Sequence, residues 1–219
     1  MCFSATASFV AGTALSTVGV ATIKMSSTKR ELPFAAVPLF FGVQQLIEGM
    51  IWLSFRGESL FSNQPLTVLY SFFSHVFWPI YVPFAIWLLE KNPVRRRLLM
   101  AIQVAGLTTG IYLLYSLIQF SITSNILGKH IVYDTPHFYI VPVMFLYLLS
   151  TCASGMLSSN KMIQIFGALS LVTFIAAYII HAATFISVWC FFAAVISLIV
   201  YFYFRQNSRG FSGLKQVKE

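Results

Sequence analysis

Residues 33–55 read PFAAVPLFFGVQQLIEGMIWLSF and contain a single charged side chain, Glu48. A helix needs about 20 mainly apolar residues to cross the roughly 30 Å hydrocarbon core of a bilayer. This run meets that length and is too long for a strand of an outer-membrane barrel. Residues 33–55 therefore predict a transmembrane helix that carries an ionisable group.

Six further apolar runs of similar length flank this one, at residues 6–23, 66–89, 98–122, 138–157, 163–181 and 185–204. The chain of 219 residues is 58% hydrophobic and 9% charged, which leaves too little polar surface for a soluble globule. The predicted fold class is all-α: a polytopic membrane protein with one seven-helix transmembrane domain, residues 1–204, and a basic cytoplasmic tail, residues 205–219. A six-span fold is the alternative, because the connection from His181 to Phe185 has no charge and no helix breaker.

The basic residues lie in alternate loops. If the N-terminus faces outward, the outer segments hold only Arg56 and Lys129 of the 14 Lys and Arg residues. Cytoplasmic loops are enriched in Lys and Arg, so we predict that the N-terminus is outside and the C-terminus inside. The net charge of +8 is explained by this orientation of the chain in the membrane and by contact of the basic residues with membrane lipids. No nucleic acid partner is therefore expected.

Ionisable residues gather in the outer half of the predicted bundle. A rise of 1.5 Å per residue places Glu48 roughly 22 Å from the inner face and His75 roughly 13 Å below the outer face. His181 ends the sixth run, Cys2 precedes the first, and Asp134 lies in the outer loop before the fifth. Polar groups at membrane depth are costly and usually functional, so we expect a site here.

Histidine, carboxylate and thiolate groups are typical zinc ligands, and catalytic zinc sites use three of them plus water. We therefore predict a metal site formed by His75, His181 and Glu48, with Cys2 or Asp134 completing the shell. Glu48 is alternatively the general base. A zinc-bound water would hydrolyse a lipid or lipid-like amide or ester.

Other interpretations of the same residues stay open. In the first interpretation, Glu48 and His75 form a hydrogen-bonded pair that joins two helices. In the second, Cys2 and Cys190 form a disulfide. In the third interpretation, the protein binds a redox cofactor: His75 and His181 are the two axial ligands of a haem, or Cys2 belongs to a copper site. In the last, Glu48 is the coupling carboxylate of a proton-coupled transporter.

Two resemblances add to this interpretation. The opening Met1-Cys2-Phe3-Ser4-Ala5, the stretch Gly42-Val-Gln-Gln-Leu-Ile-Glu48 with Trp52, and Trp189-Cys190 resemble an uncharacterised family of small bacterial membrane proteins. This resemblance covers nearly the whole chain. It implies a seven-helix, multi-pass protein of the bacterial inner membrane, and it implies no activity.

Ser71-Phe-Phe-Ser-His75 is similar to the S-x-x-x-H zinc motif of the superfamily of alkaline ceramidases and progestin/adiponectin receptors, which are seven-helix proteins. The resemblance implies that Ser71 belongs to the catalytic site, that His75 and His181 bind zinc, and that the protein is a zinc-dependent lipid amidase. The superfamily's late H-x-x-x-H pair is absent here, since residue 185 is Phe.

Overall fold

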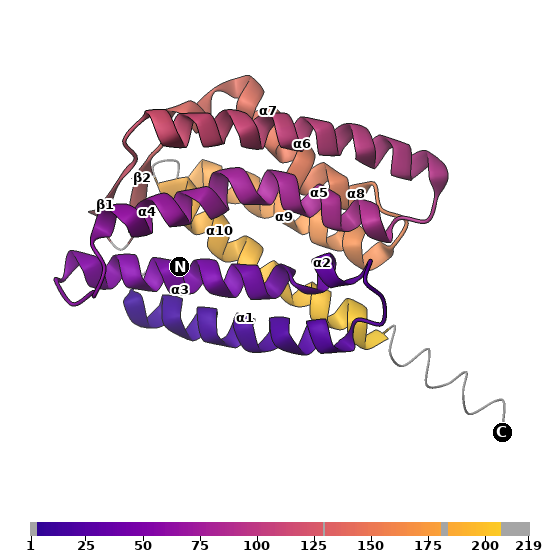
Figure 1. The fold of residues 1–219 in the computed structure, drawn as a ribbon, viewed down its shortest axis with the longest axis horizontal. Coiled ribbons are helices and arrows are strands. Elements are labelled where there is room, and N and C mark those ends of the chain that lie inside the picture. Colours follow the sequence, from indigo (N-terminus) through magenta and orange to yellow (C-terminus); the bar gives the residue numbers. More distant parts are fainter. Residues whose placement is uncertain (1–3, 129, 181–183, 207–219) are drawn as a thin grey trace.

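The computed structural model describes residues 4–128, 130–180 and 184–206. These residues form long helices that run back and forth between two ends of one bundle (Figure 1). The helices are α1 Ala5–Met25, α2 Leu32–Ala35, α3 Val37–Phe55, α4 Asn63–Ser71, α5 Trp78–Leu89, α6 Pro93–Gln119, α7 Val141–Leu148, α8 Ser154–Met156, α9 Lys161–Ile180 and α10 Phe185–Ile196. Two π-helical segments, η1 Phe72–Phe77 and η3 Leu149–Ala153, and the 3-10 turn η2 Pro136–Tyr139 join some of them.

Each of the seven predicted apolar runs contains a helix, as expected of a polytopic α-helical membrane protein. Within the described residues, six helical segments are long and apolar enough to cross a membrane: 5–25, 32–55, 63–89, 93–119, 161–180 and 185–206. The remaining apolar helix, Val141–Met156, is shorter. At 1.5 Å per residue it measures about 24 Å, less than the roughly 30 Å of a hydrocarbon core.

A short β-hairpin lies in a segment that the sequence predicts as an outer loop, and the rest of the fold is mostly helical, as the all-α fold class predicts. Strand β1, Thr123–Leu127, pairs antiparallel with β2, His130–Asp134, within the segment expected to be an outer loop. Along β2, the buried residues Ile131 and Tyr133 alternate with more exposed ones. This period of two is typical of a strand with one buried face. The alternation covers too few residues to stand out beside seven long apolar runs.

The first two long helices pack closely through small residues. A Cβ atom on Gly19 would lie 2.5 Å from the Cα atom of Leu39, and one on Gly42 would lie 2.5 Å from the Ser16 hydroxyl. Lipid tails are as apolar as the helices, so helices in a membrane associate through such close backbone approach. Glycine at these positions therefore sets the spacing of α1 and α3.

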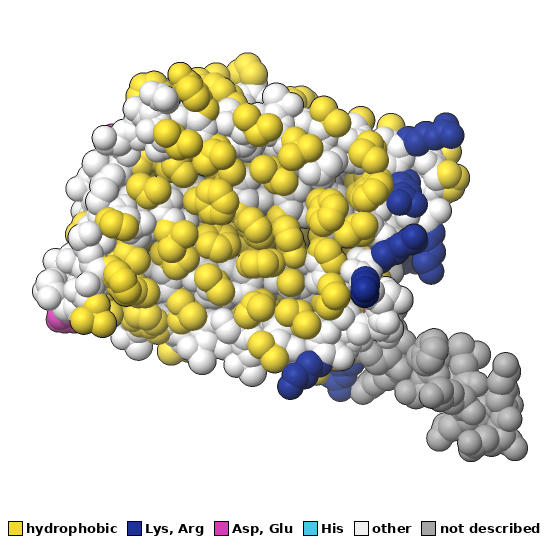
Figure 2. All heavy atoms as spheres, in the orientation of Figure 1, with side chains coloured by type: hydrophobic (Ala, Val, Ile, Leu, Met, Phe, Trp, Pro, Cys, Tyr) yellow, Lys and Arg dark blue, Asp and Glu magenta, His cyan; other side chains and the backbone are white. Residues whose placement is uncertain are grey.

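The two ends of the bundle differ in charge. Figure 2 shows a broad hydrophobic face, with Lys and Arg side chains gathered at the end opposite the hairpin of Figure 1. The end of α1, the start of α2, the α5–α6 turn and the start of α9 meet at this basic end. The tertiary structure thus brings together the basic loops that the sequence placed on one side.

Candidate functional site: a pocket beside His75

A π-helical turn interrupts the third long helix and carries His75. The Trp78 N–H donates to the Phe73 carbonyl, five residues back. The donor at the same spacing from the Ser74 carbonyl would be Pro79 nitrogen, which has no hydrogen. The Tyr147 hydroxyl of α7 donates to that carbonyl instead. The π turn is therefore held from a neighbouring helix, and π turns inside helices are frequent at functional sites.

His75 is fixed on one side of its ring and unpaired on the other. Its Nδ1 lies 3.1 Å from the Ser71 carbonyl oxygen and 2.7 Å from the Ser74 hydroxyl. A carbonyl oxygen only accepts hydrogen bonds, so the contact with Ser71 is a hydrogen bond in the tautomer that has the proton on Nδ1 and the lone pair on Nε2. Nε2 is buried and has no hydrogen-bond partner. Histidines that bind metals or act as bases are commonly anchored in this way.

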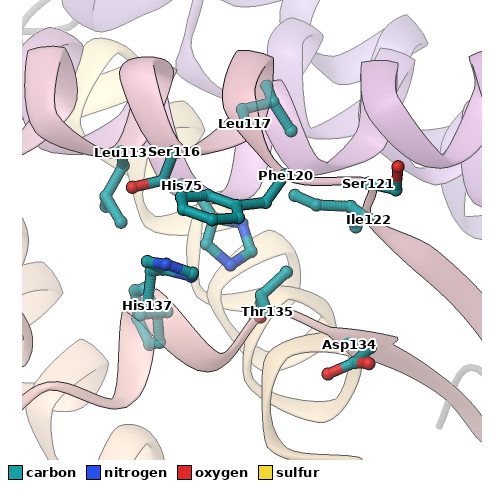
Figure 3. A pocket seen from close by; sticks show the side chains of 11 residues that line it. His75, Leu113, Ser116, Leu117, Phe120, Ser121, Ile122, Asp134, Thr135 and His137 are labelled. Carbon is teal, nitrogen blue, oxygen red and sulfur yellow. The ribbon is translucent and has the colours of Figure 1, made fainter.

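The His75 side chain lines a pocket of about 260 Å³ at the hairpin end of the bundle. Figure 3 shows its ring between α6 above and the segment that follows β2 below. One wall is apolar and includes Leu113, Leu117 and Phe120 of α6 and its C-terminal end. The polar side chains that line the pocket are His75, Ser116, Ser121, Asp134, Thr135 and His137.

Thr135 gives the pocket a second buried polar group without a partner. Only 5% of its surface is exposed, against 4% for His75, and its hydroxyl makes no hydrogen bond. A buried polar atom that stays unpaired costs about 1–3 kcal/mol. The two residues, 60 positions apart in the sequence, line one cavity, so a bound molecule that reached both unpaired atoms with a donor and an acceptor would remove both penalties.

The rim of the pocket holds two more ionisable residues. Asp134 ends β2 and is exposed. His137 is half-buried, and its ring stacks on Phe120 with 4.1 Å between ring centroids. The structure therefore brings Asp134 and His75 to the same pocket, together with His137, which the predicted ligand set omitted.

Glu48 does not line this pocket. It is fully buried on α3, where the Ser187 hydroxyl of α10 donates to its Oε1 over 2.7 Å. One turn earlier, Gln44 Oε1 accepts a hydrogen bond from the indole of Trp78 over 2.7 Å. The Cys190 thiol lies within hydrogen-bond reach of the Gln44 side chain. These residues form a polar cluster inside the bundle that links α3, α5 and α10.

The hydrogen-bonded pair of Glu48 and His75 is not formed. His75 Nδ1 is held by its own helix and Nε2 has no partner. Ser71 also differs from expectation, because its carbonyl, and not its hydroxyl, contacts His75. The Ser71 hydroxyl is buried and unpaired, and it is not among the groups that line the pocket.

The metal site stays a prediction. His181 and Cys2 lie outside the described residues, and so does the Cys2–Cys190 pairing. Within the described part of the chain, no three His, Cys, Asp or Glu side chains are close enough to hold a metal ion. His75, Asp134 and His137 line one pocket without forming such a group.

Sequence reasoning missed Thr135 and Ser187, and it left His137 out of the predicted ligand set. His137 follows Asp134 closely in the same outer segment, and this proximity was the available signal. The contact of Ser187 with Glu48 spans 139 residues, and nothing in a single sequence indicates it.

Comparison with known proteins gives one match. Residues 1–213 match a family described as "Family of unknown function (DUF6629)". The chain belongs to this family. The match spans nearly the whole chain, as the resemblance to an uncharacterised family predicted, and DUF6629 brings no activity with it. No curated protein and no solved structure matches the chain, so the likeness to ceramidases and progestin/adiponectin receptors stays a prediction.

Proposed function

We propose that this DUF6629 protein is a seven-span membrane hydrolase that cleaves an ester or amide bond of a small lipid-like molecule in the pocket beside His75. One observation carries the proposal: the same cavity is lined by His75 and Thr135, and each of these residues has a buried polar atom without a hydrogen-bond partner. Pockets that bind small molecules are mostly apolar with a few converging polar groups, and this pocket has that composition.

The chemistry follows from the two groups. His75 Nε2, as the free base, accepts a proton from a water molecule that attacks the substrate carbonyl carbon. The Thr135 hydroxyl donates to the carbonyl oxygen as that oxygen gains negative charge. The imidazolium then returns the proton to the leaving oxygen or nitrogen, which yields an acid and an alcohol or amine. The apolar wall around Leu117 and Phe120 would hold the hydrocarbon part of the substrate.

The proposed orientation puts the pocket on the outer side of the membrane. The basic end would face the cytoplasm, since Lys and Arg prefer that side, and the N-terminus would face outward. A substrate would then enter from the outer leaflet or the extracytoplasmic space. The short helix Val141–Met156 is proposed to complete the seventh span together with the residues that precede it.

Metal involvement is open to a direct test. The described residues do not complete a zinc site by themselves, so the mechanism above uses no metal. Zinc, copper or haem binding would require His181 or Cys2 next to His75. Elemental analysis and a visible absorption spectrum of the purified protein, with His75→Ala as comparison, decide whether a metal or haem is bound. If the wild type binds zinc in a 1:1 ratio and His75→Ala does not, a zinc-dependent mechanism would replace the metal-free one.

The proposal is tested with p-nitrophenyl esters and anilides of increasing acyl length and the full chain in detergent. We expect His75→Asn to lower the rate about 100-fold or more and Thr135→Val to lower it at least about tenfold. Ser121→Ala, a pocket-lining change at an exposed hydroxyl, is the matched control and should leave the rate unchanged. If the folded wild type hydrolyses none of these substrates, or if His75→Asn keeps the full rate, the proposal is wrong.

A further inference from the structure

A second hollow lies at the basic end of the bundle, far from His75. It is a groove of about 780 Å³ between the turn after α1, the α5–α6 turn and the C-terminal part of the last helix. Four cationic side chains line it: Lys29, Arg30, Lys91 and Arg96. Figure 2 shows Lys and Arg side chains gathered at this end of the molecule.

The two carboxylates in the groove, Glu31 and Glu90, offset only part of this positive charge. Glu31 Oε2 accepts hydrogen bonds from the backbone N–H groups of Ser27 and Thr28, over 2.7 and 3.1 Å. Glu90 accepts from both the backbone and the hydroxyl of Ser159, each over 2.7 Å. Within the described residues neither carboxylate forms an ion pair with a groove cation. Four cations and two carboxylates line the groove, which leaves a net positive charge and four cations without a direct carboxylate partner among the described residues.

Arg96 is positioned at the boundary between this charge and the apolar surface. Its guanidinium lies 4.6 Å from the centre of the Trp87 ring, a geometry in which the cation is attracted to the ring face. Trp87 in turn stacks on Phe84, which is 39% exposed. A continuous path thus leads from the cationic groove to side chains on the hydrophobic face of the bundle.

We propose that this groove binds the phosphate headgroup of an anionic phospholipid. Lys and Arg hydrogen-bond phosphate oxygens strongly, and the planar guanidinium does so through two parallel bonds. The occupant is a lipid because the groove continues into an exposed apolar surface, along which acyl chains would lie against Phe84 and Trp87. The site is independent of the pocket beside His75 and holds even if that pocket catalyses nothing.

The test measures the binding of phosphatidylglycerol and of phosphatidylcholine with the same acyl chains to the full, delipidated chain in detergent, by native mass spectrometry. The groove variant is Lys29→Gln/Lys91→Gln/Arg96→Gln. A matched control, Lys24→Gln/Arg97→Gln/Lys161→Gln, removes three charges from the same end but outside the groove. Thermal unfolding without added lipid checks that both variants fold as the wild type does.

We expect the wild type to prefer phosphatidylglycerol over phosphatidylcholine. The groove variant should lose about 100-fold in affinity for phosphatidylglycerol, since each basic residue contributes roughly a fivefold factor near an anionic lipid, and the control variant should lose much less. Glycerol 3-phosphate, which has the headgroup phosphate without acyl chains, should not compete. Equal losses in the two variants, equal binding of the two lipids, or full competition by glycerol 3-phosphate would each overturn the proposal.

Discussion

Tyr147→Phe tests how the π turn that carries His75 is held. The phenylalanine keeps the ring in place against Phe138 and Trp189, where the centroid distances are 5.0 and 5.7 Å. It removes only the hydroxyl that donates to the Ser74 carbonyl. Because the next backbone donor at that spacing would be a proline nitrogen, the carbonyl is left buried and unpaired. We expect the free energy of unfolding to fall by about 2 kcal/mol, within the roughly 1–3 kcal/mol that such a group costs.

A double-mutant cycle makes this reasoning sharp. Pro79→Ala supplies a backbone N–H that can reach the Ser74 carbonyl, so Tyr147→Phe in that background should cost less than about 1 kcal/mol. The coupling free energy between the two changes should therefore be about 1–2 kcal/mol. Equilibrium unfolding of the four proteins in mixed micelles, with SDS as denaturant, measures it. If Tyr147→Phe costs the same in both backgrounds, the carbonyl does not depend on the hydroxyl and this account of the π turn fails.

Three further changes probe other parts of the bundle. Gly106→Ala places a Cβ atom against the Pro79 carbonyl oxygen and should lower the free energy of unfolding by about 2 kcal/mol, since overpacking outweighs the gain in helix propensity. Burial alone raises the pKa of Glu90, but hydrogen bonds from Ser159 and neighbouring backbone N–H groups outweigh it and hold the pKa below its ordinary value of 4.5. The stability that Glu90 contributes should therefore be constant from pH 7 to about pH 5 and be lost as the pH falls through the lowered pKa. Glu48→Gln keeps an acceptor for the Ser187 hydroxyl and should unfold within about 1 kcal/mol of the wild type.

Each of these has its own control. The atoms nearest to a Cβ on Gly49 belong to the side chain of Phe9, at 3.0 Å, and a side chain can shift more easily than backbone. Gly49→Ala should therefore be close to neutral, and a similar loss at both glycines would contradict the packing argument. Glu90→Gln should reduce the fall in melting temperature below pH 5. If the fall is the same in this variant, Glu90 is not its source. Glu48→Gln should also keep hydrolysis in the pocket, whereas proton-dependent uptake lost in this variant would support the transporter interpretation.

The long helices could be predicted from the sequence because the signal is local. About 20 consecutive apolar residues identify a span without reference to any other part of the chain, and all seven predicted runs contain a helix. The gathering of the basic loops at one end follows from the same pattern, since consecutive helices alternate in direction. The β-hairpin was missed because its alternation covers only five residues a strand.

The sequence by itself determined which segments are helical, which loops are basic and how deep along its helix each polar residue lies. The tertiary structure decided which polar residues meet. Depth is a position along the helix axis, whereas contact also depends on rotation about that axis, and a π turn that adds one residue rotates the following side chains by about 100°. His75 thus shares a cavity with Thr135, whereas Glu48, on the regular helix α3, accepts a hydrogen bond from Ser187 inside the bundle.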